Sequence, residues 1–263
     1  MDLLYAETSG NPDGTPIVLL HGFTQTGRLW GEFGRILGRT HRLVLVDLPG
    51  HGGSSAVAVD LVEGAELVAE TARVALGGDD LPFDLLGYSL GSRYALHVAL
   101  GSPGQVARLV LIGATGGMDD PAAAAERRAR DEQLARGLET SGDLGAFLRR
   151  WLQAPMFAGL ADSASGVAER LRNTPEGLAS SLRLAGTGTQ SPLWGRLGSV
   201  ESPSLVLAGA ADPRFSAHAA RLARTLPAAV HSLVPGAGHA AHLHQPAVTA
   251  RLVTSWLAAT QPA

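Results

Sequence analysis

Three residues whose side chains can act together in catalysis occur in the order Ser89, Asp212 and His239. A serine hydroxyl is a weak nucleophile and a weak base until an imidazole accepts its proton. The imidazole needs a carboxylate that fixes its tautomer and stabilises its protonated form. Each of the three lies on a loop just after a predicted strand. We therefore predict a catalytic triad, although Asp212, which precedes Pro213, could instead serve only to begin a helix.

Ser89 lies in the pattern G-x-S-x-G at residues 87–91, between an apolar run and a stretch with helical spacing. A strand, a sharp turn and a helix in this order are the context of a nucleophile elbow. The glycines fit this interpretation, because such a turn brings the strand and helix backbones close together. The alternative is a turn of glycine and serine with no chemical role.

Two backbone N–H groups are expected to hold the oxygen on which negative charge develops. At an elbow, one comes from the residue after the nucleophile and the other from the loop after an earlier strand. We assign these oxyanion-hole donors to Leu90 and to Phe23, which follows His21 and Gly22. A purely structural turn at His21 and Gly22 is the alternative.

Three histidines compete for the role of the base. His239, His242 and His244 form an H-x-x-H-x-H pattern, which suggests a metal site. Carboxylates at ligand spacing are missing, so we expect no metal and no cofactor. We favour His239, because the glycines on either side of residue 237 free the loop directly after the last predicted strand.

Strand-like runs alternate with helical patterns up to residue 113, which predicts a largely parallel sheet with right-handed crossovers. The runs are residues 3–7, 17–20, 43–46, 83–87, 109–113, 204–209 and 230–234, and the clearest helices are 28–37, 60–76 and 246–257. Residues 121–197 show no convincing strand, and we expect their helices to break at Gly137, Gly142, Pro155, Gly166 and Pro175. We predict a helical cap over residues 118–198 on a core of residues 1–117 and 199–263, covering the edge of the sheet where ligands bind.

The composition of the chain excludes some classes of protein and some kinds of binding partner. The 263 residues are 45% hydrophobic and 17% charged, enough for one large folded domain. The net charge of −3 argues against nucleic-acid binding, and no apolar run is long enough to span a membrane. We see no signal peptide and no cysteine, so a cytoplasmic location is expected.

Arginine is the only permanently charged basic side chain, because the sequence contains no lysine. Arg93 lies one helical turn after Ser89, so we expect its guanidinium to be buried beside the serine. A buried guanidinium needs an anion. We favour a substrate carboxylate over an internal ion pair, which predicts a small anionic substrate.

These motifs resemble those of the α/β-hydrolase superfamily over the full length of the chain. More narrowly, the sequence resembles the 2-succinyl-6-hydroxy-2,4-cyclohexadiene-1-carboxylate synthases of menaquinone biosynthesis. The resemblance rests on residues 21–24, 47–54 and 87–93, and on the cap segments 126–131, 151–157 and 171–179.

The resemblance implies an α/β-hydrolase fold and a lyase that eliminates pyruvate from 2-succinyl-5-enolpyruvyl-6-hydroxy-3-cyclohexene-1-carboxylate. The triad would then abstract a proton, and no acyl-enzyme would form. By motif matching, the residues implied to bind substrate are Arg93, Arg127, either Arg170 or Arg172, Tyr88 and Trp151. A serine carboxylesterase or carbon–carbon bond hydrolase is the alternative and predicts an apolar pocket. A binding protein of the same fold is the third, and it would need no serine–histidine pair.

Overall fold

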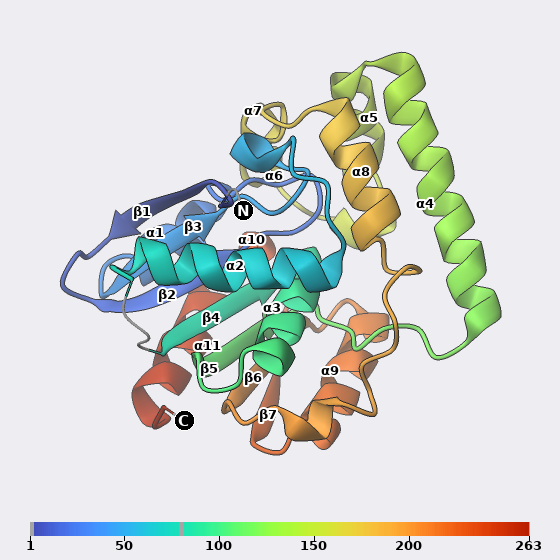
Figure 1. The fold of residues 1–263 in the computed structure, drawn as a ribbon. Coiled ribbons are helices and arrows are strands. Elements are labelled where there is room, and N and C mark those ends of the chain that lie inside the picture. Colours follow the sequence, from blue (N-terminus) through green and yellow to red (C-terminus); the bar gives the residue numbers. More distant parts are fainter. Residues whose placement is uncertain (1–2, 79–81, 263) are drawn as a thin grey trace.

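The computed structural model describes residues 3–78 and 82–262 and is built around one seven-stranded sheet (Figure 1). The strand order is β1-β3-β2-β4-β5-β6-β7. The strands are β1 Ala6–Gly10, β2 Thr15–Leu20, β3 His41–Val46, β4 Phe83–Tyr88, β5 Val106–Ile112, β6 Ser204–Gly209 and β7 Ala229–Val234. β1 pairs antiparallel with β3, and the other pairs are parallel. The α/β class and the mostly parallel sheet are confirmed.

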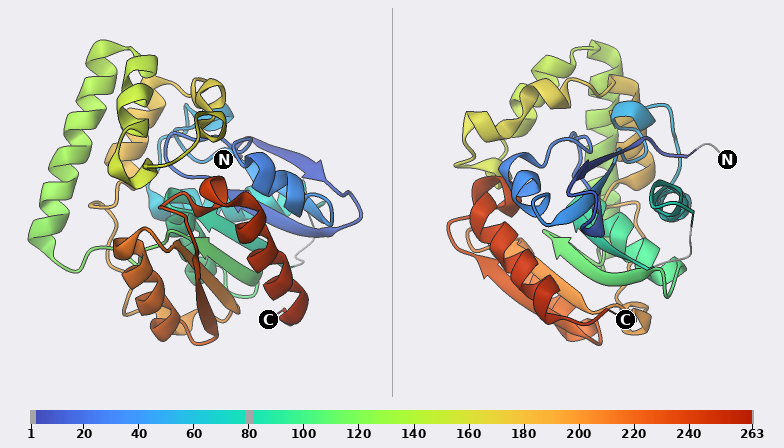
Figure 2. Two further views of the ribbon diagram at one scale, coloured as in Figure 1. Left: turned by 180° about the vertical axis from the view of Figure 1, so that it is seen from behind. Right: turned by 90° about the vertical axis from the view of Figure 1, so that its left-hand side faces the viewer.

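Helices cover both faces of the sheet (Figure 2). One face carries α2 Leu61–Ala75, α3 Leu90–Gly101 and α9 Pro213–Thr225; the other carries α1 Gly31–Leu37, α10 Ala241–His244 and α11 Pro246–Ala259. Successive side chains of a strand point to opposite faces, so Val18 and Leu20 join the first core and Ile17 and Leu19 the second. Burial on both sides explains why residues 17–20 of β2 are all apolar.

Two elements begin about three residues later than the sequence predicts. β1 begins at Ala6, because the N–H groups of Leu4 and Tyr5 bond to the hydroxyls of Thr71 and Ser54 and not to a strand. α1 begins at Gly31 rather than residue 28, and turns precede it. No helix in the described part of the chain is both long enough and apolar enough to cross a membrane.

The segment between β5 and β6 is helical and contains no strand, as predicted. It forms α4 Pro121–Ser141, α5 Leu144–Leu152, α6 Asp162–Ser165, α7 Val167–Arg170 and α8 Pro175–Ala185. α4 and α8 lie side by side to one side of the sheet (Figure 1). We call residues 118–198 the helical segment; its division from the core as a separate cap stays a prediction.

The predicted break at Gly137 is wrong. α4 runs through this residue and ends only at Gly142, whose φ of +58° forms a left-handed C-cap. A glycine inside a helix costs only about 1 kcal/mol relative to alanine. The surrounding alanines, arginines and glutamates favour helix strongly enough to outweigh that cost.

Candidate active site

Ser89 lies at the sharp turn between β4 and α3, with φ +52° and ψ −104°. Positive φ is rare for a residue with a side chain and marks a strained backbone. The flanking glycines allow the turn: a Cβ on Gly91 would lie 1.9 Å from the carbonyl oxygen of Leu20, and one on Gly87 would lie 2.4 Å from that of Gly91. The hydroxyl is thereby held at the carboxyl end of β4.

His239 links Ser89 to Asp212. Its Nε2 lies 2.9 Å from the Ser89 Oγ, and its Nδ1 lies 3.4 Å from the Asp212 Oδ2. The other Asp212 oxygen accepts the N–H of Phe215 at 3.1 Å and so caps α9. Asp212 therefore begins a helix and also faces the imidazole. Burial works to raise the pKa of Asp212, but the nearby His239 ring and the hydrogen bond from the Phe215 N–H outweigh it and lower the pKa, so the group is ionised at neutral pH.

The two competing histidines lie away from Ser89. His242 is buried against Tyr88, with ring centroids 4.3 Å apart, and neither of its nitrogens has a hydrogen-bond partner in the described chain. Burial lowers the pKa of His242 to about 3, so the ring is neutral. His244 bonds to two backbone carbonyls. Within residues 3–78 and 82–262, no group of three acidic or histidine side chains is arranged to hold a metal.

Phe23 and Leu90 both border the space in front of Ser89. Among the described residues neither backbone N–H has a partner. The N–H groups around Phe23 are occupied: Gly22 donates to the Gln25 side chain at 2.8 Å, and Gln25 donates to the Gly22 carbonyl at 3.0 Å. The loop therefore leaves the Phe23 N–H free to bind an external oxygen, as an oxyanion-hole donor must be.

A cavity of about 570 Å³ opens onto Ser89 and His239. Its apolar wall includes Phe23 and Trp151, whose rings meet edge to face with centroids 5.2 Å apart. Its cationic wall consists of four arginines, which are Arg93 on α3, Arg127 and Arg130 on α4, and Arg214 on α9. A space of this size and lining suits a small molecule with both a ring and several negative charges.

Arg93 is buried in this wall without an acidic partner. No carboxylate of the described chain lies within ion-pair distance of it, and its Nη1 has no hydrogen-bond partner there. Burial lowers the pKa of Arg93 to about 10, so the guanidinium remains charged at neutral pH. Of the two outcomes considered from the sequence, the internal ion pair is therefore not seen.

Arg127 is held by a buried carboxylate. Its Nε lies 2.9 and 3.1 Å from the two carboxylate oxygens of Asp131, one helical turn further along α4. Burial raises the pKa of Asp131, although Arg127 opposes the shift. Arg130 is exposed and pairs with Glu126 at 3.1 Å.

Three predicted substrate-binding residues lie outside the cavity wall. Tyr88 is buried behind His239, with ring centroids 5.4 Å apart. Arg170 is buried and bonds to Thr24. Arg172 is exposed and pairs with Glu169 at 3.1 Å. The cavity therefore contains Arg93, Arg127 and Trp151 but does not support substrate contact by the other three.

Six polar residues of the wall are not among the predicted site residues: Thr115, Arg130, Asp131, Ser181, Thr187 and Arg214. Two of them carried a usable signal. Asp131 follows Arg127 by four residues, the spacing of an ion pair on one helix face. Arg214 follows the predicted triad aspartate by two residues. Thr115 and Ser181 reach the cavity only through the tertiary fold.

Comparison with known proteins agrees with this geometry. The alpha/beta hydrolase family matches residues 17–252. A Shigella dysenteriae protein named 2-succinyl-6-hydroxy-2,4-cyclohexadiene-1-carboxylate synthase is 36% identical over 93% of this chain and 95% of its own length. An Escherichia coli O1:K1 protein of the same name is 34% identical with the same coverage.

Solved structures of similar proteins match nearly the whole chain. The structure of MenH from S. aureus matches with a TM-score of 0.87 and 27% identity, covering 97% of this chain and 98% of that one. A hydrolase from Pseudomonas aeruginosa matches with a TM-score of 0.77 and 25% identity, covering 96% of this chain and 93% of that one. The chain therefore belongs to the alpha/beta hydrolase family and, within it, to the enzymes named 2-succinyl-6-hydroxy-2,4-cyclohexadiene-1-carboxylate synthase.

Proposed function

We propose that this enzyme is a lyase that eliminates pyruvate from 2-succinyl-5-enolpyruvyl-6-hydroxy-3-cyclohexene-1-carboxylate. One observation carries the proposal: the Ser89–His239 pair faces a cavity in which the buried guanidinium of Arg93 has no carboxylate partner among the described residues. A base beside an unpaired cation is what proton abstraction from a carboxylate-bearing substrate requires. The names of the curated relatives agree with this reaction.

The reaction balances as a single elimination across the ring. A base removes the proton at C2, which is acidic because the succinyl group places a ketone beside it. The C–H electron pair becomes the C2–C3 double bond, and the former C3–C4 double bond shifts to C4–C5. The bond between C5 and the enolpyruvyl oxygen breaks, and the departing enolate takes up a proton to give pyruvate. The product is the 2,4-cyclohexadiene.

The proposed roles follow from the positions of the side chains. His239 accepts the hydroxyl proton of Ser89 through Nε2, and the Ser89 Oγ takes the C2 proton. Asp212 stabilises the imidazolium that results. The N–H groups of Phe23 and Leu90 bind the succinyl ketone oxygen as it becomes an enolate, an interaction typically worth about 3–4 kcal/mol for each donor.

The residues proposed to bind substrate come from both the core and the helical segment. We propose that Arg93 and Arg127 bind carboxylates and that Trp151 packs against the ring. Arg127 and Trp151 come from the helical segment, whereas Ser89 and Arg93 come from the core. The helical segment would therefore serve as a cap that completes the cavity.

Ester or carbon–carbon bond hydrolysis is the second candidate, favoured by the apolar part of the wall at Phe23, Leu134 and Met156. The decisive assay measures pyruvate release from substrate generated in situ, corrected for spontaneous decay, with p-nitrophenyl acetate cleavage in parallel. Rapid pyruvate release that disappears in Ser89→Ala supports the lyase. Ester cleavage without pyruvate release would replace it with the hydrolase.

A further inference from the structure

Thr24, the residue after the proposed oxyanion donor Phe23, has a φ of +68°. Among the described residues, Ser89 is the only other non-glycine residue with positive φ. Threonine is β-branched, so a left-handed backbone is particularly unfavourable for it and must be held by its surroundings. Each of the two strained residues adjoins one of the proposed oxyanion donors, since Thr24 follows Phe23 and Ser89 precedes Leu90.

Every polar group of Thr24 is bonded, and the side chain is completely buried. Its hydroxyl accepts from Nη1 of Arg170, and its carbonyl accepts from Nδ2 of Asn173 at 2.9 Å. Its N–H donates to Nε2 of His51 at 3.3 Å. The His51 ring can accept this bond because burial lowers its pKa to about 3 and keeps it neutral. Two of the three partners come from the helical segment.

Arg170 makes no ion pair in the described chain. Although its guanidinium is buried, its bonds go to neutral oxygens, those of the Thr24 hydroxyl and the Ser165 carbonyl at 2.8 Å. It does not line the cavity that holds Ser89. Its Nη2 is buried and has no hydrogen-bond partner in the described chain, so its only polar contacts there are with the loop after β2 and with its own helical segment.

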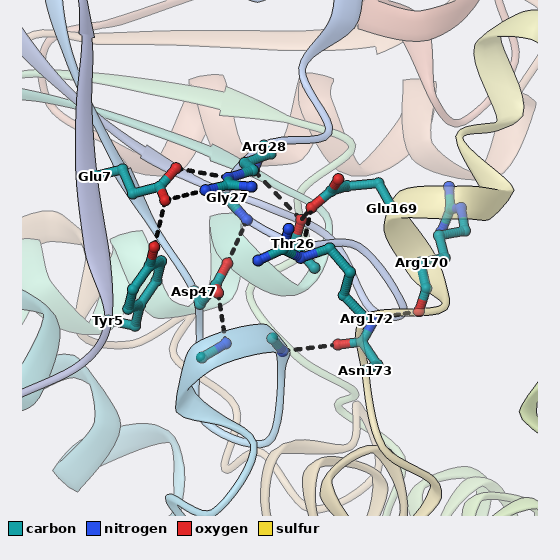
Figure 3. Close-up of polar contacts among 12 residues, drawn as sticks. Tyr5, Glu7, Thr26, Gly27, Arg28, Asp47, Glu169, Arg170, Arg172 and Asn173 are labelled. Carbon is teal, nitrogen blue, oxygen red and sulfur yellow. Dashed lines mark hydrogen bonds and ion pairs between the residues drawn. The ribbon is translucent and has the colours of Figure 1, made fainter.

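Asn173 ties the same loop to a second one. Its Oδ1 accepts the N–H of Gly52 at 2.9 Å, while its amide nitrogen also bonds to the Arg170 carbonyl at 2.9 Å (Figure 3). Nearby, Glu169 accepts a hydrogen bond from Thr26 at 3.0 Å (Figure 3). Residues 169–173 thus bond to the loop after β2 at two of its residues, Thr24 and Thr26.

We propose that Arg170 and Asn173 are positioning residues, which hold Thr24 in its left-handed conformation and thereby keep the Phe23 N–H directed at the reacting oxygen. This inference rests on the proposed function only in that Phe23 serves as an oxyanion donor. It replaces the role in substrate binding that the family resemblance suggests for Arg170.

The test uses Arg170→Met, which keeps the length and apolar stem of the side chain but removes its donors. Two readouts are needed: kcat and KM for pyruvate release, and the rate at which a neutral alkyl fluorophosphonate modifies Ser89. The phosphonate oxygen occupies the oxyanion site and carries no carboxylate. We expect kcat and the modification rate both to fall about tenfold, with KM changed less than twofold.

Two further variants extend the test, and the first of them tests the proposal by itself if Arg170→Met folds poorly. Thr24→Val keeps the shape and the strain but removes the acceptor, so it should show the same two losses. In the Arg170→Met background, Thr24→Gly should restore most of the lost rate, because glycine adopts positive φ without a steric cost. Arg136→Met on the exposed side of α4 is the matched control and should leave both rates unchanged.

The contrary results are distinct. A KM raised tenfold or more, with fluorophosphonate modification at the wild-type rate, would make Arg170 a ligand of a substrate carboxylate and overturn the inference. Unchanged values in both assays would overturn it as well. If the wild type releases no pyruvate but is modified at Ser89, the proposed reaction fails while the phosphonate assay still tests the positioning of Phe23.

Discussion

The Nδ1 of His239 lies 3.4 Å from the Oδ2 of Asp212, farther than the 2.7–2.9 Å typical of a charge-assisted hydrogen bond. On its other side, the same ring lies 2.9 Å from Ser89. The aspartate is fixed independently, because its second oxygen caps α9. The ring is therefore closely paired with the hydroxyl whose proton we propose that it accepts, and it faces a carboxylate that the start of a helix holds in place.

Two substitutions of Ser89 distinguish its contribution to catalysis from its contribution to folding stability. Ser89→Ala should lower kcat for pyruvate release about 10²–10⁴-fold, because general-base catalysis is lost. Ser89→Gly should lose as much activity but be about 1 kcal/mol more stable than Ser89→Ala, because a φ of +52° suits glycine. Steady-state kinetics and thermal unfolding check the two parts. Full activity in both variants would rule out the proposed base.

Replacing Arg93 should move affinity and stability in opposite directions. Arg93→Met removes a buried charge that has no carboxylate partner in the described chain, so the free energy of unfolding should rise by about 1–4 kcal/mol. KM for the anionic substrate should rise about 10–100-fold, whereas cleavage of a neutral ester should change little. Urea denaturation and kinetics measure these quantities, with Arg136→Met as the control. A large loss of stability would mean that Arg93 has a structural partner.

Buried histidines should make stability fall in acid. Burial lowers the pKa of His21 and His97 to about 4, and that of His51 and His242 to about 3, against about 6.5 in the unfolded chain. Between pH 6.5 and 4 the unfolded chain therefore binds more protons than the folded chain. The free energy of unfolding must then decrease as the pH falls through this interval.

His242→Leu isolates one of these groups, because the ring of His242 makes no hydrogen bond in the described chain. Between pH 6 and 4 the variant should lose about 1.4 kcal/mol less stability per pH unit than the wild type. Urea denaturation at several pH values gives both slopes. Identical slopes would show that His242 is protonated in the folded protein.

The nucleophile elbow should not tolerate a methyl group added at Gly91. Gly91→Ala places a Cβ 1.9 Å from the Leu20 carbonyl oxygen, a clash that only backbone movement can relieve. We expect a loss of about 3 kcal/mol or more, together with activity. Gly101→Ala at the other end of α3 meets nothing within 4 Å and should be neutral or slightly stabilising. Equal stabilities would mean that the turn tolerates a side chain.

The features that the sequence predicts well are those fixed by local spacing. The elbow at residues 87–91 and the two loops that carry Asp212 and His239 each follow a strand, and the ends of parallel strands meet at one edge of the sheet. Asp212 illustrates how two interpretations that compete in the sequence are both satisfied in space, since it caps a helix and faces the imidazole.

The sequence predicts poorly those features that depend on the direction in which a side chain points. Tyr88 precedes Ser89 at the end of β4, where successive side chains point to opposite faces, so it packs behind His239. Arg170 and Arg172 lie two residues apart at the end of a single helical turn, and residues with that separation point in different directions. Motif matching carries over the identity of a residue but not the side of the element on which it lies.

The proposed binding of a carboxylate to the unpartnered guanidinium of Arg93 also links ligand binding to folding stability. A ligand that supplies the missing negative charge binds the folded chain and not the unfolded chain, so it must shift the folding equilibrium. At a concentration 100 times its dissociation constant, such a ligand adds about 2.7 kcal/mol to the free energy of unfolding. The ligand-free protein is therefore less stable than the ligand-bound protein, and a rise in melting temperature identifies the carboxylates that bind.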